Sequence, residues 1–332
     1  MDIIIQYSLF VMKIITFLFF FIILFLFINI LCKKKNNTIK GILKVTNIID
    51  HYNHMQGIIV SSKMNKYHKK KWFIKTKKQK CFKNKNFHEN MLKPTLYVID
   101  FYGDMHASEV FSLREEISAI ISVAKKHDEV LLRLESSGGT IHEYGLAASQ
   151  LQRLRDKKIK LTVSIDKIAA SGGYMMACVA NHISASYFSI IGSIGVVSLI
   201  PNFYKFLKKN NIDIELHTAG NYKRTLTMFG ENTTYNRQYF QNKLNDTHNL
   251  FKQFIYNMRP CLDIHKVSNG DYWFGVDALR KKLIDSINTS DDIILNKMSD
   301  FNIFHIQYIK SKKVINHFLR YFLNKIKNYL FI

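Results

Sequence analysis

The apolar and polar residues divide the chain into an apolar start, a lysine-rich stretch and a long mixed region. Residues 14–31 carry no charge and are rich in Phe, Ile and Leu, and a helix needs about 20 such residues to cross a bilayer core. Three lysines follow at 33–35, so the positive-inside rule places the bulk of the protein on the cytoplasmic side. A cleaved signal peptide fits less well, because the run has no basic leader and no small-residue cleavage site after it.

From Pro94 onward, short apolar runs alternate with segments of helical periodicity. Turn residues bound apolar runs that predict strands at 96–101, 130–134, 161–165 and 183–185. The intervening spacing predicts helices at 108–126, 140–155 and 174–179, and a longer helix at 235–258. The repeated strand–turn–helix order indicates an α/β fold with a mainly parallel sheet. Ligands of such sheets bind beyond the carboxyl ends of the strands.

Three other segments carry specific expectations. Residues 187–204 are apolar and uncharged, but glycine, serine and proline interrupt them, so we expect buried strand and loop and not a second membrane span. Arg114, Glu115 and Glu116 form the charged face of the 108–126 helix and are expected to be solvated. In the tail, residues 314–326 present one apolar helical face among lysines and arginines. This face suits either the membrane interface or the protein core.

Composition adds a charge asymmetry. The chain has 332 residues, is 47% apolar and carries a net charge of +23. Between Lys33 and Lys93 stand seventeen lysines, no arginine and two acidic residues. We expect a solvated juxtamembrane linker, and attraction of anionic lipid or nucleic acid is the alternative. The four cysteines form no CxxC pair, and the chain has no metal-binding or nucleotide-binding motif.

Two residues carry the chemistry. Ser171 stands in Ala-Ala-Ser-Gly-Gly, where a predicted strand turns into a predicted helix, and Lys223 follows in Asn-Tyr-Lys-Arg-Thr. A serine needs a base to become a nucleophile, and a lysine amine can be that base when desolvation keeps it neutral. We therefore expect a dry pocket around Lys223. A Ser–His arrangement with His106 or His142 is less favoured, because no acidic residue is placed to orient either ring.

Five stretches in this order resemble the signal peptide peptidase A family, and the match to its SohB-type members is close. They are residues 104–110, 135–139, 166–174, 191–196 and 222–227. The resemblance spans Pro94 to about Ser290. It implies a ClpP/crotonase-like fold and a serine–lysine peptidase that needs no cofactor and assembles as a homo-oligomer, often a ring.

The resemblance also implies residue roles. Ser171 would be the nucleophile, Lys223 the general base, and Ser193 the residue that orients the lysine amine. The backbone amides of Gly138, Gly139 and Gly172 would form the oxyanion hole, where donors meet the charge that develops on the carbonyl oxygen.

Two positions depart from the family pattern. Ser137 stands where proline usually precedes the glycine pair, which loosens that turn. The stretch Lys281–Asp285 lacks the glycine often found before Leu283.

The expected organisation is a membrane anchor at 1–32, a lysine-rich segment at 33–93, a peptidase domain at 94–290 and a basic amphipathic tail at 291–332. The expected activity is that of a serine endopeptidase anchored in the bacterial inner membrane. It would cleave signal peptide remnants or misfolded, membrane-proximal proteins, with membrane lipid as a further partner and no nucleic acid. Relatives commonly work outside the cytoplasm, so the side of the membrane stays open. The alternatives are a crotonase-type acyl-CoA enzyme and a non-catalytic scaffold or polyanion binder.

Overall fold

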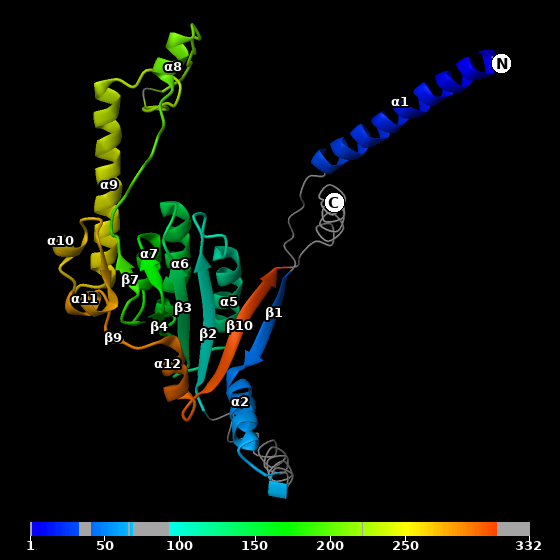
Figure 1. Ribbon diagram of the computed structural model, residues 1–332. Coiled ribbons are helices and arrows are strands. Elements are labelled where there is room, and N and C mark those ends of the chain that lie inside the picture. The colour runs from blue at the N-terminus through cyan, green and yellow to red at the C-terminus, as the bar shows by residue number, and fades with distance from the viewer. Residues whose placement is uncertain (1, 33–40, 66, 69–92, 221, 311–332) are drawn as a thin grey trace. The chain divides into compact units, whose positions relative to one another are not determined.

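The computed structural model describes residues 2–32, 41–65, 67–68, 93–220 and 222–310 (Figure 1). The chain divides into two units, one of Met1–Gly41 with Lys310–Ile332 and one of Ile42–Ile309. Helix α1 (Asp2–Cys32) lies in the first unit. Within the described ranges, no helix combines the length and the apolarity that crossing a membrane requires. The predicted anchor stays a prediction, and the predicted tail helix at 314–326 lies outside the described residues.

The second unit is built on one twisted sheet. Its main path runs β1 (Gly41–Asn47), β10 (Asn302–Lys310), β2 (Thr95–Gly103), β3 (Glu129–Ser136), β4 (Lys160–Ile165), β6 (His182–Ala185) and β9 (Ser286–Ile287). Three short strands branch from β3, namely β5 (Ile168–Ala170), β7 (Ile190–Gly192) and β8 (Tyr272–Phe274). Pairs from β10 through β9 are parallel, and β7 with β8 is antiparallel. The predicted α/β class and mainly parallel sheet are confirmed.

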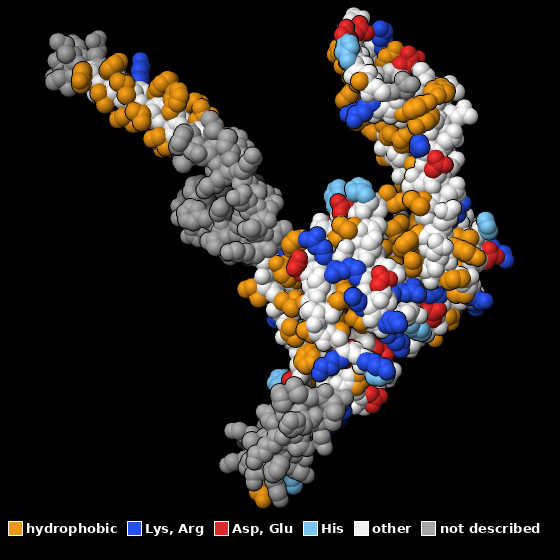
Figure 2. All heavy atoms as spheres, turned by 180° about the vertical axis from the view of Figure 1, so that it is seen from behind, with side chains coloured by type: hydrophobic (Ala, Val, Ile, Leu, Met, Phe, Trp, Pro, Cys, Tyr) orange, Lys and Arg blue, Asp and Glu red, His pale blue; other side chains and the backbone are white. Residues whose placement is uncertain are grey.

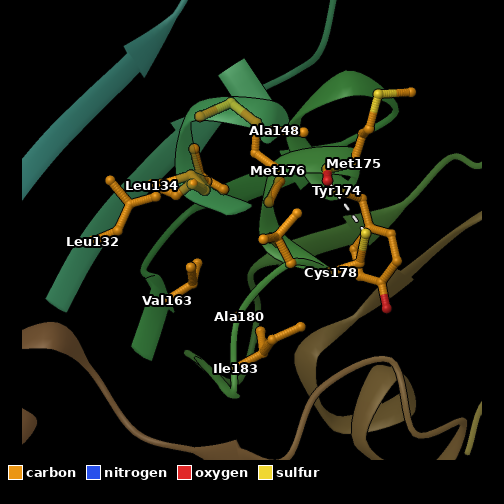
Figure 3. Close-up of a cluster of buried hydrophobic side chains, with 14 of the residues drawn as sticks. Leu132, Leu134, Ala148, Val163, Tyr174, Met175, Met176, Cys178, Ala180 and Ile183 are labelled. Carbon is orange, nitrogen blue, oxygen red and sulfur yellow. Dashed lines mark hydrogen bonds between the residues drawn. The ribbon is translucent and has the colours of Figure 1, made fainter. Parts of the chain in front are cut away.

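Three helices cover one face of this sheet. They are α5 (Val110–Val123), α6 (Ile141–Asp156) and α7 (Gly172–Ala177), each following its strand as the apolar periodicity predicts. Figure 3 shows part of this core, in which Tyr174 and Met176 of α7 belong to the same buried cluster as Leu132, Leu134, Val163 and Ile183. Burial of the Cys178 thiol there raises its pKa to about 12, so the thiol stays protonated.

A smaller cluster packs on the opposite face. Leu96, Val98, Leu131, Ile294 and Ile303 form it, covered by α2 (Ile48–Ser62) and α12 (Ser290–Lys297). The first turn of α12 is tied to the loop before Ser171. Asp166 accepts hydrogen bonds from the Ser290 amide at 2.9 Å and the Ser290 hydroxyl at 2.6 Å. The C-terminal elements thus brace the loop that leads to the candidate nucleophile.

The region after β7 departs from expectation. Tyr187 and Phe188 are 63% and 84% exposed, and Val197 and Leu199 are 91% and 94% exposed. The prediction of buried strand and loop across 187–204 therefore holds only for about residues 189–196 and is wrong at both ends of the range. The segment continues through α8 (Tyr204–Lys209) to α9 (Thr234–Met258). Only the C-terminal half of α9 packs on the core, through Phe251 and Ile255. Figure 2 shows apolar side chains gathered over this projecting segment.

The end of the unit folds into short elements. Helix α10 (Ile264–Val267) and helix α11 (Gly275–Arg280) flank β8 before the chain returns to the sheet through β9. Lys282, between α11 and β9, adopts a φ of +62°. This is the left-handed region that favours glycine, the residue that the family resemblance led us to expect before Leu283.

Glu116 corrects a second expectation. It was expected to be solvated with Arg114 and Glu115, but it is buried against β10, where one carboxylate oxygen accepts the Tyr308 amide at 2.7 Å. Its other oxygen has no hydrogen-bond partner among the described residues. Burial raises the pKa of Glu116 to about 7, against the opposing effect of the Tyr308 hydrogen bond. Charge alone did not reveal that this position faces the last strand.

Candidate active site

Ser171 occupies a strained turn between β5 and α7. Its backbone adopts φ +53° and ψ −118°, which residues with a Cβ atom rarely adopt and which costs on the order of 1–3 kcal/mol. The turn is held because the Ser171 amide donates to the Gly192 carbonyl at 2.8 Å. Strand pairing of Ser136 with Ala169 fixes the approach from the other side. The half-buried hydroxyl thus stands at the carboxyl ends of the strands, where sites of such folds are expected.

The glycine turn after β3 lies directly against Ser171. Gly138 has a φ of +89°, and a Cβ placed on it would lie 2.8 Å from the Ser171 Cβ and 2.8 Å from the Gly172 nitrogen. A side chain at this position would therefore displace Ser171. The structure brings Ser171, Gly138 and Gly172 together.

The three predicted oxyanion donors are not equivalent. The Gly138 amide already donates to the Ser136 hydroxyl at 3.0 Å. Gly172 is the first residue of α7, so its amide has no acceptor within the helix. The Gly139 amide has no hydrogen-bond acceptor among the described residues. Of the three predicted donors, those of Gly139 and Gly172 are therefore the ones without an acceptor among the described residues.

Ser193 lies one residue beyond the carbonyl that holds Ser171. Its φ is +49°, and its amide donates to the Asp271 carbonyl at 2.7 Å. The residue is half-buried.

Lys223 does not lie beside the Ser171 turn. It is exposed, and its neighbour Tyr222 stacks on Tyr239 of α9 with ring centroids 4.3 Å apart. His248 of α9 contacts the Ile194 carbonyl at 3.3 Å and marks the level of the Ser171 turn. Tyr239 precedes His248 by nine residues, a helical rise of roughly 14 Å.

Within one chain, the structure therefore does not bring the lysine to the serine. No hydrogen bond among the described residues joins Lys223 to Ser171. The dry environment expected for the amine is absent in the isolated chain, because the segment that carries it projects into solvent. His142 and Arg224 are also exposed.

A hollow of about 390 Å³ borders the glycine turn. It is lined by Tyr102, Gly103, Asp104, Glu135, Ser136, Ser137 and Ile168. Glu135 on its wall pairs with Lys167 at 3.0 Å. Among the described residues, no group of His, Cys, Asp and Glu side chains is arranged to hold a metal ion.

Sequence reasoning missed two residues of this site. Ser136 and Tyr144 are buried beneath the glycine turn, and their hydroxyl oxygens lie 2.6 Å apart. Tyr144 lies within the predicted helix, and Ser136 ends a predicted strand. The one signal that could have drawn attention is a tyrosine on the apolar face of a helix, because a buried phenol usually needs a hydrogen-bond partner.

Known protein families match most of this chain. Two family models match, "Peptidase family S49 N-terminal" over residues 2–151 and "Peptidase family S49" over residues 153–303. The chain belongs to peptidase family S49. This S49 peptidase is 54% identical over 331 residues to "Probable protease SohB" of Buchnera aphidicola subsp. Schizaphis graminum, covering 98% of this chain and 96% of that protein.

A second relative supports the same assignment. "Probable protease SohB" of Haemophilus influenzae is 45% identical over 329 residues, covering 96% of this chain and 93% of that protein. The S49 peptidase is therefore of the SohB type, as the motifs predicted.

Two solved structures show distant likeness. The 1510-N membrane protease from Pyrococcus horikoshii, specific for a stomatin homolog, has a TM-score of 0.37 at 12% identity and covers 62% of this chain and 79% of its own. The ClpP catalytic domain of Plasmodium falciparum has a TM-score of 0.34 at 12% identity, covering 58% of this chain and 85% of its own. These scores are too low to support a conclusion about activity.

Proposed function

We propose that this S49 peptidase is a serine endopeptidase in which Ser171 is the nucleophile and Lys223 the general base. The observation that carries the proposal is the strained Ser171 turn, packed against Gly138 and at the start of α7. Strain of this kind persists only where the surroundings impose it, and it gathers at reactive groups. Family membership favours this reading over an acyl-CoA enzyme or a non-catalytic scaffold.

The reaction would pass through an acyl-enzyme. The Ser171 hydroxyl oxygen attacks the peptide carbonyl while its proton moves to the neutral Lys223 amine. The resulting oxyanion accepts hydrogen bonds from the Gly139 and Gly172 amides; losing one such donor typically costs about 10²–10³ in rate. Lys223 then protonates the leaving amine, and a water molecule releases the acyl group. In this scheme Ser193 orients the amine. The hollow beside Ser137 accepts a side chain of the extended substrate.

The dyad would be completed by a neighbouring copy of the chain. The segment that carries Lys223 exposes Val197, Leu199 and Phe206 to solvent, and such apolar surface is typical of interaction sites. Burial of that segment between copies would also remove water from the amine, which the chemistry requires.

Mixing experiments test this arrangement. A Ser171→Ala chain and a Lys223→Ala chain are each expected to be inactive alone. Refolded together, they should regain part of the wild-type activity, because some interfaces would combine an intact serine with an intact lysine. If mixtures stay inactive while equally treated wild-type chains recover, the dyad is not shared between copies.

Location and substrate complete the proposal. The apolar N-terminal segment would anchor the protein in the bacterial inner membrane and contact lipid. This position would expose the site to signal peptide remnants and misfolded proteins near the bilayer. Cleavage of an unfolded model protein, together with labelling by a fluorophosphonate probe, tests the activity. Labelling should occur at Ser171 in the wild-type chain and be absent from Ser171→Ala. Cleavage retained by purified Ser171→Ala would refute the assignment.

A further inference from the structure

Beneath the glycine turn lies a chain of hydrogen bonds that begins at a backbone amide and ends at a backbone carbonyl. The Gly138 amide donates to the Ser136 hydroxyl at 3.0 Å. The Ser136 and Tyr144 hydroxyl oxygens lie 2.6 Å apart. The Tyr144 hydroxyl donates to the Asp104 carbonyl at 2.8 Å. Because the tyrosine proton is committed to that carbonyl, Ser136 must donate to Tyr144 and accept from Gly138.

The direction of every proton in this chain is thus fixed. Ser136 is 1% exposed and Tyr144 is fully buried, so water does not compete for these bonds, and consecutive bonds in a low-dielectric interior reinforce one another. Burial also raises the pKa of Tyr144, which keeps its hydroxyl protonated. A buried hydroxyl pair of this kind holds its partners rigidly only while both members are present.

Tyr144 also contacts the second donor. A Cβ placed on Gly172 would lie 2.4 Å from the Tyr144 ring, so the ring packs directly under the start of α7. The same side chain therefore supports the Gly172 amide by its ring and the Gly138 peptide by its hydroxyl. These two supports act on neighbouring peptides, since a Cβ placed on Gly138 would lie 2.8 Å from the Gly172 nitrogen.

The turn needs such support because of its sequence. Residue 137 is a serine, so the backbone before the glycine pair lacks the constraint that a proline ring would impose. A hydrogen bond from the following amide to Ser136 restrains the same peptide by other means. It also removes the Gly138 amide from the set of oxyanion donors.

We propose that Ser136 and Tyr144 are positioning residues that fix the glycine turn and so aim the Gly139 and Gly172 amides at the oxyanion. The inference rests on the proposed serine peptidase function and adds to it two residues that do not touch the substrate's reacting atoms. Its distinctive consequence is that losing either hydroxyl should weaken binding of the transition state more than binding of the substrate.

The test uses the full-length chain and the variants Ser136→Ala, Tyr144→Phe and the double variant. Tyr144→Phe keeps the ring under Gly172 and removes only the hydroxyl. The matched control is Tyr174→Phe, which also removes one buried tyrosine hydroxyl, bonded to the Leu283 carbonyl at 2.9 Å, but leaves the glycine turn alone. The measurements are kcat and KM on an unfolded protein, the inhibition constant of a peptide boronate that forms a tetrahedral adduct, and the urea unfolding midpoint.

Each single variant is expected to lower kcat by roughly 10–100-fold, part of the loss that follows removal of a whole donor. Boronate affinity should fall by a similar factor, while KM changes less than about threefold. The double variant should be little worse than either single variant, because one chain of bonds is broken only once. Tyr174→Phe should match the single variants in urea midpoint and keep the wild-type kcat.

Several results would overturn the inference. One such result is that kcat and boronate affinity of both single variants stay within threefold of the values for Tyr174→Phe. Another is a double variant whose losses multiply, because the two hydroxyls would then act separately. If Tyr144→Phe does not fold, Ser136→Ala alone decides by the same criteria. A wild-type chain that neither cleaves protein nor reacts with a fluorophosphonate would instead refute the proposed function, and the inference with it.

Discussion

The Gly138→Ala substitution tests the packing of the candidate site most directly. The new Cβ would lie 2.8 Å from the Ala170 carbonyl oxygen, the Gly172 nitrogen and the Ser171 Cβ. None of these atoms can rotate away, because each is backbone or attached to it. The backbone φ of +89° adds a penalty of about 1–2 kcal/mol for a residue with a side chain.

The packing and backbone penalties of Gly138→Ala add to one destabilisation. Overpacking of a close-packed site typically costs about 1–3 kcal/mol, so with the backbone penalty we expect a loss of about 3 kcal/mol. For a unit of this size, each kcal/mol shifts the melting temperature by about 2–4 °C, which predicts a fall of roughly 6–12 °C. Activity should fall at least 100-fold, because both proposed oxyanion donors and the proposed nucleophile would move.

The control is the same substitution seven residues later. Gly145 lies in α6 with open space around its Cβ position, so Gly145→Ala should add helix propensity worth up to about 1 kcal/mol. Thermal unfolding followed by circular dichroism, with cleavage of an unfolded protein, measures both variants. A Gly138→Ala chain that melts with the wild type and keeps its activity would refute the packing described for the turn.

Three further predictions concern other parts of the molecule. Lys282→Gly should raise the free energy of unfolding by about 0.5–1 kcal/mol, because glycine accepts φ +62° without the penalty that lysine incurs; an unchanged urea midpoint would contradict this. Folding favours the neutral form of Glu116, so the stability that this group contributes is complete below its ordinary pKa of 4.5 and is lost as the pH rises through about 7. The wild type should therefore lose stability relative to Glu116→Gln between pH 5 and 8, as measured by urea unfolding of both chains at each pH. If the difference in unfolding free energy stays constant over this range, the carboxyl does not titrate there. Leu199→Asp should lower the molecular mass measured by light scattering without changing the melting temperature, whereas Ile58→Asp on α2 should leave the mass unchanged; equal masses for Leu199→Asp and wild type would remove this residue from the interface.

Local pattern was enough to predict the central elements. The helix expected at 235–258 is observed as Thr234–Met258, and the strand expected at 161–165 as Lys160–Ile165. Strong apolar periodicity, bounded by turn residues, leaves few alternatives for such segments. The turn at Ser171 followed from the same logic, since it joins an apolar strand to an apolar helix.

The failures share a different physical cause. In the sequence, Val197 and Leu199 look like core residues. In the structure both side chains are exposed, because no segment close to them in sequence packs over them. Glu116 looks like surface, because nothing near it in sequence shows that β10 will pack on its helix. The Ser136–Tyr144 pair depends on contacts between a strand end and a helix that hydropathy does not encode. Each miss therefore concerns tertiary packing, which the local pattern of apolar and polar residues does not encode.

The tie between Asp166 and α12 affects the order in which the molecule can mature. The loop that leads to Ser171 receives its brace from Ser290, and β10, which follows, inserts beside β2 through residues 302–305. A chain still on the ribosome lacks both until translation has passed these positions. The Ser171 turn would thus be synthesised early but would lack this brace. An incomplete chain would therefore have little activity against other nascent proteins near it. Stop codons shortly before residue 290 should, by the same logic, yield inert products even though every candidate catalytic residue has been synthesised.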